Sequence, residues 1–136
     1  MSIGNGRSRM ERVEEKLERW LKKVKQYFPA EWEAEAAKWY PHFIPPWIEF
    51  PAGAHYHAKM IVESFRAKDL PFSEKIHRIL YYLIGFITYA FLAHKAQEME
   101  TRKHVMPYYI DAITSEVTHI LFPWIISEIE KLEKRR

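Results

Sequence analysis

Several residue types are scarce or missing in this 136-residue chain. Cysteine is absent, which excludes disulfide bonds, thiolate metal sites and cysteine nucleophiles. Glycine occurs only four times, and the chain contains neither a phosphate-cradling loop nor a nucleophile-elbow motif. No segment alternates polar and apolar residues with period two, so β-strands are not expected. We therefore expect an all-α protein that is not an enzyme and holds no cofactor.

Side-chain amides are also rare, since asparagine occurs once and glutamine twice, whereas lysine and arginine together number 21 and the acids 18. Few thermolabile amides beside many ion-pairing residues are typical of proteins from thermophiles. The formal net charge is only +3, so no global positive field demands a nucleic acid. The distribution of the charges is therefore more informative than their sum.

The longest apolar run, residues 79–93, bears on a membrane location. At about 1.5 Å per residue, a helix of this length reaches only about 22 Å, short of the roughly 30 Å hydrocarbon core. A fully buried helix is therefore favoured over a membrane span, with membrane contact left open. The first ten residues lack the apolar stretch of a secretory signal.

Hydrophobic periodicity and the prolines predict five helices. They are expected at residues 8–28, 31–40, 54–68, 73–103 and from 107 to the C-terminus. The segment PHFIPPWIEFPAG, residues 41–53, contains four prolines and a glycine and is expected to form an extended strap. Pro123 predicts a kink in the last helix. The expected organisation is an N-terminal arm with its strap, residues 1–52, and a helical-bundle core, residues 53–136.

The last two helices are apolar nearly all round in their middles, a pattern typical of helices buried on several sides. A core of three such helices leaves apolar surface uncovered, so we expect a partner chain to complete the bundle. The strap would carry the arm away from its own core and anchor it on a neighbouring subunit. Its anchoring side chains would be Phe43, Ile44, Trp47 and Phe50.

The first helix divides into three sectors when it is wound at 100° per residue. One sector is apolar and a second is largely acidic. The third gathers five cations without an acid: Arg9, Arg12, Lys16, Arg19 and Lys23. Such a row can follow the phosphates of one nucleic-acid strand without reading its sequence, and Arg7 would extend it. A solvated face or a protein contact is the alternative, because Glu15–Arg19 and Glu18–Lys22 are spaced to pair within the helix.

Two groups of residues contain side chains that can ligate a metal. If the last two helices form a hairpin that turns near residue 105, position 94 faces position 117, and four ligands fall at one level: His94, Glu98, Glu116 and His119. His55 and His57 form a second candidate. Interfacial histidine–glutamate pairs are commoner than metal sites, and no bridging carboxylates are available, so we expect no metal.

The layout resembles that of the coat proteins of filamentous archaeal viruses, which are small, all-α and cysteine-free, with a basic helical arm before a helical bundle. The resemblance rests on architecture and composition over the whole chain. It implies a capsid subunit that wraps double-stranded DNA through its arm and pairs with an identical or related coat protein. It also implies a virion location, with the host cytoplasm before assembly. The alternatives are a small helical subunit of a ribonucleoprotein or CRISPR-type assembly, and a metal-dependent bundle enzyme.

Overall fold

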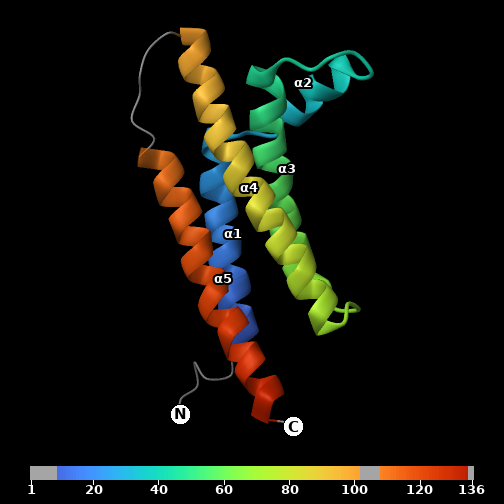
Figure 1. Ribbon diagram of the computed structural model, residues 1–136, viewed down its shortest axis with the longest axis vertical. Coiled ribbons are helices and arrows are strands. Elements are labelled where there is room, and N and C mark those ends of the chain that lie inside the picture. Colours follow the sequence, from blue (N-terminus) through green and yellow to red (C-terminus); the bar gives the residue numbers. More distant parts are fainter. Residues whose placement is uncertain (1–8, 102–107, 135–136) are drawn as a thin grey trace.

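The computed structural model describes residues 9–101 and 108–134, and every element in these ranges is an α-helix. The helices are α1 (Arg9–Tyr27), α2 (Glu31–Trp39), α3 (Pro46–Arg66), α4 (Phe72–Thr101) and α5 (Tyr108–Lys134). The predicted all-α class is therefore confirmed. Helices α3 and α4 form a hairpin, α1 and α5 run alongside each other, and the short α2 packs on α3 (Figure 1).

Helix α3 begins eight residues earlier than expected, so the predicted extended strap was too long. Pro45 is extended, and Pro46 occupies the start of the helix, where a missing N–H removes no hydrogen bond. Pro51 lies inside the helix and is buried, although it cannot donate to the carbonyl of Trp47. The expected boundary between residues 52 and 53 therefore falls within a continuous helix. Helix α5 likewise continues through Pro123, and the kink there stays a prediction.

Helix α1 lies in the core of its own chain, whereas the sequence pattern had suggested a separate arm. Its apolar stripe is buried together with side chains of α3, α4 and α5. Trp20 has no exposed surface, meets Phe86 of α4 edge-on at 5.0 Å between ring centroids, and donates its indole N–H to the carbonyl of Ile113 at 2.8 Å. The largest fully buried side chains among the described residues are Leu17, Trp20, Val24, Ile61, Val62, Ile79, Phe86, Ile110, Val117 and Leu121.

Two glycines allow α3 and α4 to approach closely. A Cβ atom at Gly85 would lie 2.2 Å from the ring of His57, and one at Gly53 would lie 2.6 Å from the ring of Tyr89. Each ring therefore fits only because the opposing helix lacks a side chain at that point. This reciprocal packing explains why the α3–α4 hairpin is the most extensive helix contact among the described residues.

The packing of α5 differs from the expected hairpin with α4. These two helices touch little, and α5 packs mainly on α1. His94 lies against Tyr109, with ring centroids 5.8 Å apart, rather than opposite position 117. The offset of eight residues corresponds to about 12 Å along a helix. The apolar stripe of α1 is buried in one cluster with side chains of α4 and α5, and α5 contacts α1 more extensively than it contacts α4.

The outer face of α4 is largely exposed, so this chain by itself does not bury the helix fully. Within the described residues, one helix segment (Phe72–Met99) is long and apolar enough to cross a membrane, and 28% of its most apolar window is buried. Tyr81, Ile84 and Phe91 are all exposed. Core helices of soluble proteins pass the same test of length and composition, but they are mostly buried. Helix α4 therefore carries an apolar face that the described helices leave uncovered.

Trp20→Ala should destabilise the bundle by about 3–5 kcal/mol, because it opens a cavity and removes a buried hydrogen bond. Urea denaturation followed by circular dichroism measures the change. Trp39→Ala is the matched control, since Trp39 lies on α2 and is 37% exposed; its cost should be about 1 kcal/mol or less. Equal losses for the two variants would contradict the central position assigned to Trp20.

Candidate functional site

The cations predicted on one face of α1 lie on the outside of the bundle. Arg12, Lys16, Arg19 and Lys23 are all exposed, and we call this set the basic face. Arg9 belongs to α1, but its side chain lies outside the described residues, as does the whole of Arg7. From Arg12 to Lys23 the face extends for about 16 Å by helix rise.

The acidic sector of α1 has a partner within the chain. Arg66, at the end of α3, donates its Nε to Glu14 at 3.0 Å and its Nη2 to Glu18. The hydrogen bond that Arg66 donates to Glu18 is the largest cause of the raised pKa of Arg66. Glu14 and Glu18 therefore bind the neighbouring helix α3, and Glu18 contacts Arg66 rather than the Lys22 suggested by sequence spacing.

The basic face, in contrast, remains mostly unpaired. Lys23 is the exception, since its Nζ donates to Glu116 of α5 at 2.7 Å. Arg12, Lys16 and Arg19 form no ion pair with any acid in the part of the chain that the structure describes. Three adjacent cations are thus exposed without neutralisation, which favours an external anionic partner.

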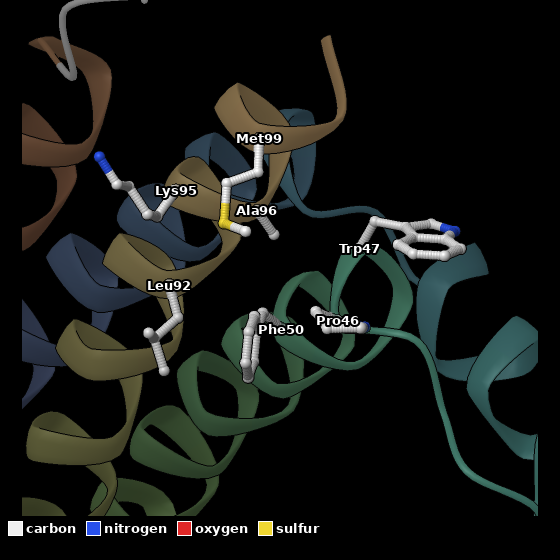
Figure 2. Close-up of a pocket in the computed structure, with 7 residues that line it drawn as sticks. All are labelled: Pro46, Trp47, Phe50, Leu92, Lys95, Ala96 and Met99. Carbon is white, nitrogen blue, oxygen red and sulfur yellow. The ribbon is translucent and has the colours of Figure 1, made fainter. Parts of the chain in front are cut away.

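A second surface lies between the start of α3 and the end of α4, where an apolar groove of about 410 Å³ opens to solvent (Figure 2). Its lining residues are Pro46, Trp47, Phe50, Leu92, Lys95, Ala96 and Met99. The ring of Phe50 and the side chains of Leu92 and Met99 border the hollow, and Lys95 supplies the only charged group among these residues. Such a lining suits an apolar side chain of another molecule.

The four proposed interface anchors have different positions. Trp47 and Phe50 line the apolar groove. Phe43 is 79% exposed in the connection before α3, and Ile44 beside it is half-buried. The structure therefore brings two of the anchors together in one hollow and leaves Phe43 projecting from the surface.

The four metal candidates are not gathered into one site. His94 and Glu98 are neighbours on α4, with Nε2 and Oε1 3.9 Å apart, and the Tyr109 hydroxyl lies 3.5 Å from Nδ1 of His94. Glu116 is bound by Lys23, and Nδ1 of His119 lies 2.7 Å from the carbonyl oxygen of Ser115 on its own helix. No group of three or more metal-ligating side chains converges within residues 9–101 and 108–134. The register of α5 against α1 is what separates them.

His55 and His57 also point to different partners. His57 donates Nδ1–H to the carbonyl of Gly53 at 2.8 Å and packs among tyrosine rings. His55 is buried, and its Nδ1 lies 2.5 Å from Oε1 of Glu33 on α2. Lys59 donates to the other oxygen of Glu33 at 3.3 Å. No residue of α2 is buried, and Glu33 makes the side-chain polar contacts of α2 with α3 that the structure describes.

No family model, curated protein or solved structure matches this chain. Its candidate sites therefore stand on the geometry of its own residues.

Sequence reasoning missed the α4 side of the groove and the attachment of α2. Leu92 and Met99 belong to a helix that was expected to be buried, so no pattern marked them as surface residues. The sequence gives one weak signal for Glu33, since it is an acid in the first turn of a short helix. Only the packing of α2 on α3 identifies its partners.

Glu33→Gln should loosen α2 without unfolding the bundle. Burial alone would raise the pKa of Glu33, but the hydrogen bonds and charge interactions with His55 and Lys59 together outweigh it, so the pKa lies below the ordinary 4.5. Its stabilisation is therefore present above pH about 4.5 and is lost as the pH falls through the lower folded-state pKa. The protection of residues 31–39 against hydrogen exchange, taken relative to the intrinsic exchange rate at each pH, should fall by about 1–3 kcal/mol in the variant. It should fall likewise in the unchanged protein at acid pH.

Glu35→Gln is the matched control for this prediction. Glu35 lies on the same helix and pairs only with Lys38 of that helix, at 3.5 Å, among the contacts described. Its exchange rates should remain near those of the unchanged protein. Equal acceleration in both variants would show that Glu33 has no special role.

Proposed function

We propose that this protein is a structural subunit that coats nucleic acid, with the basic face of α1 as its phosphate-binding surface. The observation that carries the proposal is the row of Arg12, Lys16 and Arg19, exposed and unpaired among the described residues. On the same helix, Glu14 and Glu18 bind Arg66. A solvated helix usually intersperses its charges. Here the cations are left available to an outside partner.

The fixed position of α1 supports backbone recognition over sequence reading. The helix is anchored through Trp20 and lies against α5, so its cations form a rigid row rather than a flexible tail. Phosphate contacts of this kind fix orientation on a duplex and carry no sequence information. Binding is therefore expected to be sequence-independent, with double-stranded DNA as the proposed partner.

Self-assembly is the second part of the proposal. The uncovered apolar face of α4 and the groove beside Trp47 and Phe50 give each subunit surface for contacts with other copies. A coat needs both properties, a polyanion-binding side and a subunit-binding side. The finer proposal, a capsid subunit of a filamentous virion, also draws on the resemblance to coat proteins of filamentous archaeal viruses.

Replacing Arg12, Lys16 and Arg19 by glutamate should abolish binding to duplex DNA. For the unchanged protein, the logarithm of affinity should fall with the logarithm of salt concentration, with a slope of about −0.9 per phosphate neutralised. Fluorescence anisotropy with two duplexes of unrelated sequence measures both the affinity and its independence of sequence. Unchanged affinity in the triple variant would end the proposal for this face.

The matched control reverses three other exposed cations, Lys22, Lys25 and Lys68, and so makes the same change in net charge. If the position of the charges matters, this variant keeps much more affinity than the first. Electron microscopy with and without DNA tests the coat itself, because a coat subunit should build regular filaments. Tight binding to RNA without filaments would favour a subunit of a ribonucleoprotein assembly instead.

A further inference from the structure

Helix α4 has apolar projections toward one end of its outer face and an apolar hollow at the other. Tyr81 and Ile84 project, with 62% and 66% of their surfaces exposed. The apolar groove lies toward the C-terminal end, where Leu92 and Lys95 line it. Thr88 is exposed and lies midway between the two ends. Residues 84 and 92 are each four positions from it, and residues 81 and 95 are each seven positions from it.

We propose that α4 pairs antiparallel with α4 of a second copy of this chain, about a two-fold axis at Thr88. In such a pair Ile84 of each copy meets Leu92 of the other, and Tyr81 meets Lys95, so the projections of each chain enter the groove of its mate. A two-fold contact requires a surface that is complementary to itself, and this helix carries both halves of the fit. The exposed positions 81, 84, 88, 91 and 95 have the three- and four-residue spacing of a helix-packing seam.

The charges select the antiparallel orientation. Between residues 79 and 93 the helix carries no charged residue, so the centre of the seam is apolar or neutral. A parallel pair would place the two Lys95 ammonium groups against each other. The antiparallel pair separates them by about 21 Å along the axis and brings each to a tyrosine ring or hydroxyl. The helix dipoles are also opposed favourably.

This pairing deepens the self-assembly part of the proposed function and does not depend on the basic face. The DNA-binding test can therefore fail while the pairing stands, and the reverse is also true. A lipid surface is the other occupant that an apolar face of this length could take, and the experiment separates the two.

The absence of cysteine makes introduced thiols unambiguous reporters. Thr88→Cys, oxidised mildly without nucleic acid or lipid, should form a disulfide-linked dimer, because an axial residue lies opposite its own copy. Linking should be faster by about tenfold or more than for Ala112→Cys, an exposed position on α5. Ile84→Cys and Leu92→Cys should each link poorly alone and efficiently when the two proteins are mixed.

Ile84→Lys provides a test without cross-linking, because it places a charge in each groove of the pair. The unchanged protein should sediment as a dimer or larger species, and this variant should shift to a species of 16.4 kDa. If Thr88→Cys forms the disulfide no faster than Ala112→Cys, the pairing is overturned. If the mixture of Ile84→Cys and Leu92→Cys forms no disulfide-linked dimer, the proposed register is overturned. Flotation of the unlinked protein with uncharged phosphatidylcholine vesicles, which do not attract the basic face, would assign the apolar face to lipid and also overturn the pairing.

Discussion

The position of Trp20 between α1, α4 and α5 is the constraint on which the rest of the bundle depends. Helices α4 and α5 touch little, so α5 is held mainly through α1. The indole of Trp20 is completely buried there, and its N–H donates to the carbonyl of Ile113, so this large side chain carries no unpaired polar group. A buried donor without a partner would cost about 1–3 kcal/mol.

Once the apolar stripe of α1 is committed to this junction, the directions of its two charged sectors are fixed. The acids face α3 and meet Arg66, while the cations lie toward α5 and solvent. Lys23 is near enough to Glu116 to be neutralised, and Arg12, Lys16 and Arg19 are not. The two charged sectors of α1 therefore have different surroundings: Glu14 and Glu18 belong to an ion-pair cluster with Arg66, and the basic face is turned outward.

The same packing explains the exposure of α4. Its inner side is covered by α1 and by the glycine-mediated contact with α3, and none of the described helices reaches its outer side. An uncovered apolar face is a liability for a monomer unless another molecule shields it. The basic face and the apolar face are thus two consequences of one arrangement, with α1 inserted into the bundle rather than extended from it.

Local information in the sequence determined the helical class, the bounds of α1 and α2 to within a few residues, and the grouping of the cations on one face. These properties depend on 3.6-residue periodicity and on residues near one another in the chain. The prolines of residues 41–53 predicted too long a strap, because the effect of a proline depends on its position. Pro46 is favourable at a helix start, and Pro51 is tolerated inside a packed helix. Composition also indicated that apolar surface would remain uncovered.

Tertiary structure alone decided which surfaces meet. A simple hairpin of the last two helices would place the four metal candidates at one height along the bundle. In the structure α5 packs on α1 instead, and Glu116 forms an ion pair with Lys23. Trp47 and Phe50 could be named as exposed anchors from the strap, yet their partners Leu92 and Met99 follow only from the crossing of α3 and α4. Contacts between helices depend on their order and register in space, and periodicity along the chain specifies neither.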